Sequence, residues 1–215
     1  PLSMIMGYSE QLEQAENLDE EQRKQVQIMK AQSIKIKRLI EDLNLTSKLQ
    51  YQMQPLRMET YHPAKQFRQL VVSYYNEGLG EQYEINLDVA PEVEALELKG
   101  DTQLLVRAYE NIIGNSLRHN KSGCRVNIIL RKKEDWLAIL FEDDGVGIPE
   151  AVKNGLLSEI NYEEEKEGDD LGRPHIMGLH VVKQIILSHK GRMEILDTKS
   201  GAKIKISLPI QESAF

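Results

Sequence analysis

The stretch WLAILFEDDGVGIPE, residues 136–150, joins a short apolar run to two aspartates and two glycines. Residues 136–141 have the length and the aromatic and branched content of a buried strand. A turn needs one glycine at a position of positive φ, and Asp-Gly alone would supply it, so Gly147 is more than a turn requires. Asp143 and Asp144 follow the strand directly. We therefore expect a ligand-binding loop where this strand leaves the core.

The composition sets limits on the class of protein. A chain of 215 residues can hold one domain of about 150 residues and a smaller unit. The net charge of -7 argues against a nucleic-acid surface. No apolar run reaches the ~20 residues that span a bilayer, and there is no signal peptide. Cys124 is the single cysteine, which excludes a disulfide framework and favours a reducing compartment. Because the chain begins at Pro1, we expect it to be a piece of a longer protein.

The first 50 residues read as two antiparallel helices. Residues 2–16 form the first, residues 17–21 the turn and N-terminal cap, and residues 19–50 the second. The second helix carries one apolar stripe: Val26, Met29, Ile36, Ile40 and Leu43. Because such a hairpin cannot close a core by itself, we expect it to pair with a second copy as a four-helix bundle. The alternative is a hairpin packed on its own C-terminal domain.

A different pattern begins after a junction marked by Pro55 and Pro63, so we place the domains at residues 1–53 and 54–215. Expected helices cover residues 63–78, 101–120 and 178–191, and expected strands cover residues 83–90, 125–133, 136–143, 192–199 and 202–210. Helices and strands do not alternate strictly, which favours an α+β two-layer sandwich over a doubly wound parallel sheet. Residues 158–173 are acidic and poor in apolar side chains, and we expect them to form a lid or loop.

The helix at residues 101–120 carries Asn111 and Asn115 at i and i+4, on one face. Carboxamide oxygens suit Mg²⁺, which takes its remaining ligands from water and substrate phosphates. An unpaired buried amide costs roughly 1–3 kcal/mol, so a buried helix rarely holds two asparagines without a reason. Taken alone, the pair also fits a cap or a structural hydrogen-bonding role.

Three segments in order resemble the sensor histidine kinases, whose ATP-binding domain belongs to the GHKL ATPase superfamily. NIIGNSLRHN (residues 111–120) is similar to the asparagine box, DDGVGIP (143–149) to the first glycine box, and GLHVVKQIILSHKG (178–191) to the second glycine box and its helix. Upstream, residues 1–12 match the segment directly after the phospho-accepting histidine, and residues 36–49 resemble the second helix of the dimerisation hairpin. The resemblance covers essentially the whole chain and implies ATP and Mg²⁺ as cofactors.

The resemblance also implies roles for the base-binding and metal-binding residues. Asp143 would accept a hydrogen bond from the adenine amino group, and Gly145 and Gly147 would let the backbone approach the base. Asn115 would hold Mg²⁺ between itself and the phosphates. Asn111 would help to organise the metal's water shell or the phosphate.

Further residues would surround the phosphates. Arg118 would offer them positive charge, and His119 would lie beside the nucleotide. Gly178, with the adjoining Leu179, would stand at the start of the next helix and present backbone N–H groups. Arg173 is the cation near the lid that could reach the phosphates.

The chain also departs from the family pattern. Ile176 stands where the second glycine box usually has a glycine, and no aromatic box is recognisable in residues 150–172. The phosphorylated histidine and its acidic neighbour would precede Pro1. The five histidines of the chain occur in other contexts: His62, His119, His175, His180 and His189.

The resemblance implies the catalytic core of a two-component kinase with a truncated hairpin. In the intact protein, ATP would phosphorylate a histidine, which would pass the group to an aspartate of a response regulator. We expect a homodimer, in the cytoplasmic portion of a membrane-anchored bacterial protein. One alternative is a non-catalytic dimeric scaffold whose nucleotide site has decayed. Another is a GHKL ATPase of a different kind, but those usually place Glu where Asn111 stands and lack this hairpin.

Overall fold

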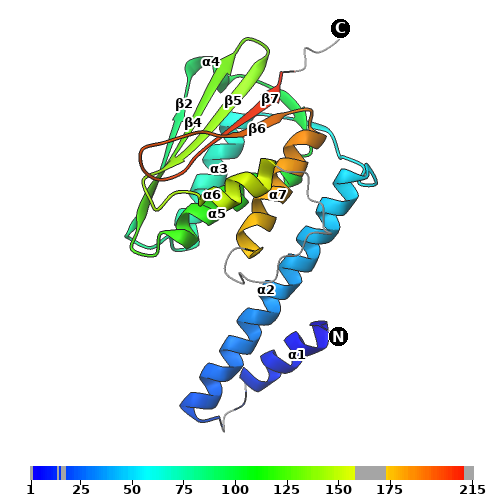
Figure 1. Cartoon of the computed structure of the whole chain (residues 1–215), viewed down its shortest axis with the longest axis vertical. Coiled ribbons are helices and arrows are strands. Elements are labelled where there is room, and N and C mark those ends of the chain that lie inside the picture. The colour runs from blue at the N-terminus through cyan, green and yellow to red at the C-terminus, as the bar shows by residue number, and fades with distance from the viewer. Residues whose placement is uncertain (1, 14, 16–17, 158–172, 211–215) are drawn as a thin grey trace.

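The computed structural model describes residues 2–13, 15, 18–157 and 173–210. Its first two helices, α1 (Leu2–Glu13) and α2 (Glu20–Gln50), lie side by side along the lower half of α2 (Figure 1). Asp19 caps α2 in a capping box: its carboxylate accepts from the Gln22 N–H at 2.7 Å, and the Gln22 carboxamide oxygen accepts from the Asp19 N–H at 3.1 Å. The expected cap and hairpin are confirmed.

The apolar stripe on α2 is mostly exposed in the single chain. Ile36 and Ile40 are 47% and 48% exposed, and Met29 and Leu43 are exposed as well. Of the five residues of the stripe, only Val26 is buried. The expectation that all five residues form one partner-facing stripe is therefore wrong for Val26, which is covered within its own chain.

The upper end of α2 packs on the α/β part of the chain, beside α7 (Arg173–Ser188), as Figure 1 shows. Leu45 and Leu49 belong to the same buried cluster as the sheet residues. Asp42 accepts a hydrogen bond from Arg107 at 2.6 Å. The alternative of a hairpin packed on its own domain thus holds for the last turns of α2 and not for the stripe.

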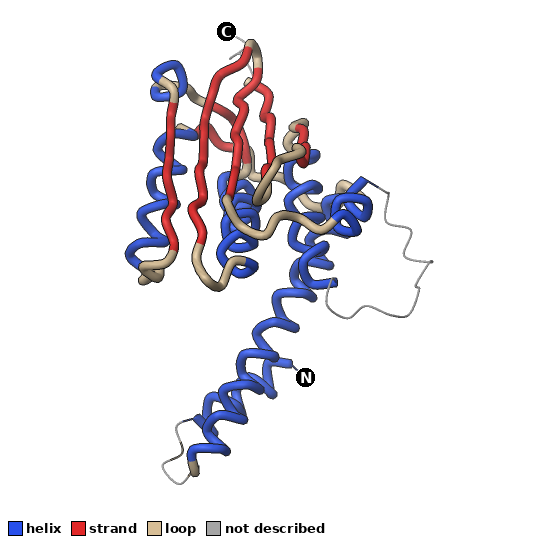
Figure 2. Tube along the Cα trace, turned by 60° about the vertical axis from the view of Figure 1, so that its left-hand side comes forward, coloured by secondary structure: helices blue, strands red, loops and turns tan. Residues whose placement is uncertain are grey.

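The main sheet has five strands in the order β2 (Tyr83–Val89), β4 (Cys124–Lys133), β5 (Trp136–Asp143), β7 (Lys203–Pro209) and β6 (Arg192–Ile195). Only β2 and β4 are parallel; the other neighbouring pairs are antiparallel. Helices α3 (Pro63–Asn76), α5 (Thr102–His119) and α7 lie on one face of this sheet (Figure 2). The expected two-layer α+β sandwich is confirmed.

Four short elements were not predicted. Strands β1 (Glu59–Tyr61) and β3 (Leu98–Gly100) form a small antiparallel pair, and α4 (Pro91–Glu94) precedes β3. Helix α6 (Glu150–Leu157) follows the glycine loop in a stretch expected to be irregular. Elements of three to eight residues are too short to show a reliable hydrophobic period.

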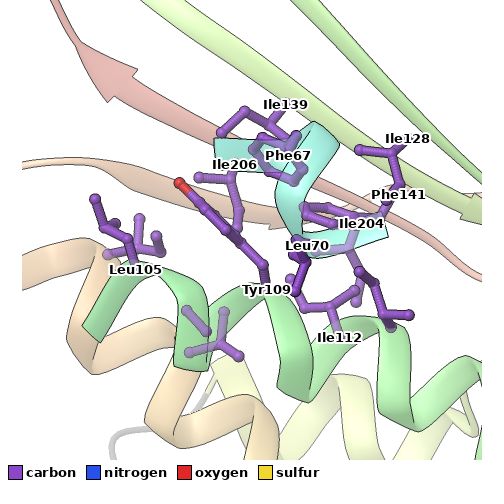
Figure 3. Close-up of a cluster of buried hydrophobic side chains, with 14 of the residues drawn as sticks. Phe67, Leu70, Leu105, Tyr109, Ile112, Ile128, Ile139, Phe141, Ile204 and Ile206 are labelled. Carbon is purple, nitrogen blue, oxygen red and sulfur yellow. The ribbon is translucent and has the colours of Figure 1, made fainter. Parts of the chain in front are cut away.

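The core fills the space between the sheet and the helices, and Figure 3 shows its centre. The Phe67 and Tyr109 rings lie 4.5 Å apart, and Phe141 packs about 6 Å from both. Every second residue of β5 faces this layer, so Leu137, Ile139 and Phe141 are buried. Asp143 continues the alternation. Its side chain therefore turns inward, toward the helices, at the end of the strand.

Candidate functional site

The Asp143 carboxylate joins three segments of the chain. It is 6% exposed, and its Oδ1 accepts from the backbone N–H groups of Gly145 at 3.0 Å and Ala202 at 3.1 Å. Its Oδ2 accepts from the Ser116 hydroxyl of α5 at 2.6 Å. A carboxylate has about four acceptor positions, so Oδ2 keeps capacity for one more donor. The bonds fix the direction of that remaining position.

The glycine loop, residues 144–148, is clamped by Asn120 at the end of α5. Asn120 is 5% exposed; its Oδ1 accepts from the Val146 N–H at 2.9 Å, and its Nδ2 donates to the Ser116 carbonyl at 2.8 Å. A Cβ on Gly145 would lie 2.1 Å from the Asn120 amide. Gly147 has φ of +82° and a virtual Cβ 2.8 Å from the Gly201 carbonyl oxygen. The loop therefore needs glycine at both positions, and this explains why the sequence has Gly147 in addition to Gly145.

We expect Gly145→Ala to displace Asn120 and release the loop, because the new methyl group and the buried amide cannot share the space. Two buried hydrogen bonds would be broken, so thermal stability should fall, and affinity for a ligand held by this loop should fall about tenfold or more. Thermal melts and ligand titrations measure the two effects. Gly7→Ala, on exposed α1 with open space at the virtual Cβ, is the matched control and should leave affinity unchanged.

A cavity of about 270 Å³ lies between α5, the glycine loop, α6, α7 and the sheet. Most of its wall is apolar: Ile112, Val146, Ile148, Val152, Leu179 and Ile204. Helix α5 contributes residues 112, 115, 116 and 119, and its C-cap contributes residue 120, a spacing that places them on one face. The Asp143 carboxylate is the acidic group in this wall. The cavity can therefore take a flat, largely apolar ligand with one hydrogen-bond donor aimed at Asp143.

Five of the residues expected in the site line this cavity: Asn115, His119, Asp143, Gly147 and Leu179. Burial and the charge of Arg118 lower the pKa of His119, and Asp143 offsets part of that change. The ordinary pKa of histidine is already near 6.5, so the His119 imidazole is neutral at pH 7. It offers a ligand a neutral ring and no positive charge.

Asn111 and Asn115 both face Gly178 of α7. A Cβ on Gly178 would lie 3.9 Å from Asn111 Oδ1 and 3.9 Å from Asn115 Nδ2. Asn111 Nδ2 is buried without a hydrogen-bond partner among the described residues. An amide group held in this way is available to a ligand or to a water molecule.

The expected position of Gly178 at a helix start is wrong. Helix α7 begins at Arg173, so Gly178 lies in its second turn, where backbone N–H groups bond within the helix. Pro174 is the second residue of α7, and proline favours the first turn of a helix. This local signal starts the helix earlier than the glycine box suggested.

Arg118 contacts the asparagine expected to bind metal. Its Nη2 donates to Asn115 Oδ1 at 2.7 Å. Burial and the nearby Arg38 of α2 lower the pKa of Arg118, but arginine stays charged at neutral pH. Arg118 therefore supplies the expected positive charge, and its guanidinium group is hydrogen-bonded to the side-chain oxygen of Asn115. The Arg173 and Ile176 side chains, and residues 158–172 of the expected lid, lie outside the described residues.

Sequence reasoning missed Ser116, Asn120 and the loop before β7. Ser116 and Asn120 stand four and eight residues after Ile112, so helical spacing could have placed them beside the cavity. No local signal could have found Ala202, which is 59 residues from Asp143. Gly201, at φ of +69°, has a virtual Cβ only 1.7 Å from the Asp143 carbonyl oxygen, so only glycine fits beside this strand end.

Two family models match the chain. Residues 100–212 match the histidine kinase-, DNA gyrase B- and HSP90-like ATPase family, and residues 1–52 match the His Kinase A (phospho-acceptor) domain. The chain belongs to the sensor histidine kinases. The chain is the catalytic core of such a kinase, in which the hairpin precedes the ATPase domain. The match over residues 1–52 disfavours a GHKL ATPase of another kind.

Relatives agree with this membership. Sensor histidine kinase YvrG of Bacillus subtilis is 27% identical over 197 residues, which is 91% of this chain and 33% of that protein. The alginate biosynthesis sensor protein KinB of Pseudomonas aeruginosa is 27% identical over 173 residues, covering 80% of this chain and 28% of that protein. The chain thus spans about a third of the length of these relatives.

Solved structures share the fold. The Acinetobacter baumannii histidine kinase AdeS superposes with a TM-score of 0.67 at 19% identity, covering 98% of this chain and 96% of that one. Histidine kinase ThkA, solved in complex with the response regulator protein TrrA, superposes with a TM-score of 0.70 at 15% identity. The match covers 98% of this chain and 58% of the ThkA chain. Among the described helices of this sensor kinase, none is long and apolar enough to cross a membrane.

Proposed function

We propose that this kinase core binds ATP with Mg²⁺ in the cavity beside Asp143 and, in the full protein, supplies the γ-phosphoryl group to a histidine. The observation that carries the proposal is the buried Asp143 carboxylate, which retains one acceptor position at the end of an apolar cavity. The ATPase family match supports ATP as the nucleotide.

The cavity has the size of a base and not of a whole nucleotide. Ligand pockets usually measure ~300–1,000 Å³, and this one is about 270 Å³. We therefore place adenine between Ile112, Leu179 and Ile204, with its amino group on Asp143. Gly145 and Gly147 keep the loop backbone close to the base. The triphosphate would leave the cavity past Asn115 and His119.

The metal would be held mainly by the nucleotide. The described residues contain no group of three His, Cys, Asp or Glu side chains that could hold a metal ion, so they do not by themselves complete a cation site. The side-chain oxygens of Asn115 and Asn111 both face Gly178, whose missing side chain leaves room between them, and Asn111 Nδ2 is buried without a partner among the described residues. This fits Mg²⁺ bound through Asn115, water and phosphate oxygens. Mg²⁺ would neutralise charge on the phosphates.

Arg118 would change partner when the nucleotide binds. Its Nη2 now bonds to Asn115 Oδ1, the oxygen that the metal needs. A phosphate oxygen is a stronger acceptor for a guanidinium than a neutral carboxamide. We propose that Arg118 moves to the phosphates and releases Asn115. Arg173, at the first position of α7, is proposed as a further phosphate contact.

Asn115→Ala should remove the Mg²⁺ dependence of nucleotide binding more than it removes adenine recognition. The proposed metal contact is Asn115 on α5, whereas the polar contact to the base is Asp143 at the end of β5. Calorimetric titrations of ATP with Mg²⁺ and of ADP with EDTA measure the two contributions. Equal loss of both would show that Asn115 is structural.

We propose residues 1–53 as the dimerisation hairpin and residues 54–215 as the ATP-binding domain, in the cytoplasmic portion of a membrane-anchored protein. Residues 1–52 contain no histidine, although they match the phospho-acceptor domain. His62 precedes α3, His119 lines the cavity, and His180 and His189 are buried in or beside α7. We therefore propose that none of these accepts the phosphoryl group. A response regulator would be its final acceptor; the structurally similar ThkA was solved in complex with a response regulator protein.

Calorimetry of the unmodified chain tests the proposal. ADP should bind one site per chain, and GDP should bind at least tenfold more weakly. Incubation with ATP should leave no acid-labile phosphate on the chain. Failure of ADP to bind at millimolar concentration would favour the alternative of a dimeric scaffold with a decayed nucleotide site.

A further inference from the structure

Ser116 has an unusual hydrogen bond for a serine inside a helix. Such hydroxyls commonly bond to the carbonyl four residues earlier in their own helix, as Ser188 does with Gln184 at 2.7 Å. The Ser116 hydroxyl instead donates to Asp143 Oδ2 at 2.6 Å, 27 residues further along the chain. Ser116 also lines the cavity. Its hydroxyl is therefore committed to the carboxylate at the ligand end of the site.

The Ser116 carbonyl is also held in place. It accepts from Asn120 Nδ2 at 2.8 Å and from Cys124 Sγ at 3.6 Å. Asn120 in turn fixes the glycine loop through the Val146 N–H. Ser116 thus stands between the Asn120 clamp and the Asp143 carboxylate, so its position is determined from both sides.

The direction of the Ser116 hydrogen decides what the cavity can recognise. A hydroxyl has one hydrogen and two lone pairs, and Asp143 Oδ2 has taken the hydrogen. Two acceptors, Asp143 Oδ2 and Ser116 Oγ, then stand side by side with no donor between them. A bond from a hydroxyl to a carboxylate is about twice as strong as a neutral one, so the hydrogen will not turn readily to a ligand.

We propose that Ser116 is a specificity-determining residue of the nucleotide site. It fixes Asp143 Oδ2 toward the ligand and keeps that end of the cavity free of donors. A purine with a 6-amino group meets two acceptors, and a purine with a 6-carbonyl group meets repulsion. This inference rests on the proposed nucleotide binding and adds a second residue to base selection.

A ligand series separates this role from a general structural one. The three probes are ADP, the diphosphate of inosine, which has a 6-carbonyl, and the diphosphate of unsubstituted purine riboside. For Ser116→Ala, affinity for ADP should fall about 5- to 30-fold, because the carboxylate loses its orienting bond. Affinity for the unsubstituted probe should fall less than twofold. Affinity for the inosine probe should rise relative to ADP.

Two further variants serve as rescue and control. Ser116→Thr keeps the hydroxyl and should restore the preference for ADP. Ser188→Ala removes a helix hydroxyl that bonds to its own backbone, away from the cavity lining, and should change no affinity. Circular-dichroism melts establish whether each variant is folded. If Ser116→Ala does not fold, the base preference of Ser116→Thr tests the proposal on its own.

The outcomes are distinct. If the unmodified chain does not bind ADP, the proposed function fails, and this inference fails with it. If the unmodified chain binds ADP but Ser116→Ala weakens all three probes equally, or none of them, nucleotide binding stands and the role of Ser116 in base selection is refuted. A Ser116→Thr variant that loses the preference for ADP refutes it as well.

Discussion

Asp143→Asn is expected to lower the affinity for adenine nucleotides by about 100-fold or more while the fold stays intact. The asparagine oxygen can still accept from Gly145 and Ala202, so the two backbone bonds on Oδ1 survive. The amide nitrogen replaces Oδ2, and the Ser116 hydroxyl can turn to accept from it. The ligand's amino group then meets a donor. A charge-assisted bond of ~1.5–3 kcal/mol is lost, and an unpaired donor adds roughly 1–3 kcal/mol.

Calorimetry with ADP measures this effect, and Asp144→Asn is the matched control. Asp144 is the neighbouring aspartate, but it is exposed and its Oδ1 accepts from the Arg125 N–H at 2.8 Å, outside the cavity. Its asparagine variant keeps that acceptor and should bind ADP normally. Unchanged affinity in Asp143→Asn would contradict the assignment of Asp143 to the base.

Replacing Ile36 and Ile40 together by Glu is expected to convert dimers into monomers. Both side chains are nearly half exposed in the single chain, on the α2 stripe with Met29 and Leu43. Helix α1 also carries exposed apolar residues: Met4, Ile5, Tyr8 and Leu12. Burying each isoleucine in a partner is worth ~1.5–3 kcal/mol, and a symmetric dimer buries four of them. Four buried charges in their place would exceed what association can offset.

Sedimentation at several concentrations measures the dimer, and calorimetry should show unchanged ADP affinity, because neither residue lines the cavity. Gln27→Glu with Ala31→Glu is the control. These two residues are exposed, have the same i, i+4 spacing, and lie on the opposite side of α2. The control should remain dimeric. An unmodified chain that is monomeric at high concentration, or a double variant that stays dimeric, would refute this interface.

Local patterns were enough to predict the longer elements and part of the site. The alternation in residues 137–143 places Asp143 on the core-facing side of β5, and two nearby glycines mark its loop. The i, i+4 spacing of Asn111 and Asn115 places both toward Gly178. The Asp19 cap is equally local. Each of these features depends on residues a few positions apart, which sequence reasoning can see.

Other features depend on contacts between distant segments, and no local pattern carries them. Ala202 reaches Asp143 because β7 pairs with β5, and Gly201 is required only by that pairing. The bond from Arg107 to Asp42 depends on how α2 meets α5. Gly178 is a different case: Pro174 was a local signal for an earlier helix start, and the glycine-box resemblance led to the wrong boundary.

The most direct test of the nucleotide site is a titration of the unmodified, ¹⁵N-labelled chain with ADP and Mg²⁺, followed by amide NMR spectra. We predict saturable shifts at Gly145 and Ala202, whose N–H groups bond to the Asp143 carboxylate, and at Val146 and Gly147, which line the cavity. The amides of α1, far from the cavity, should not move (Figure 1). Saturable shifts elsewhere with these four unchanged, or no shifts at millimolar nucleotide, would contradict the site.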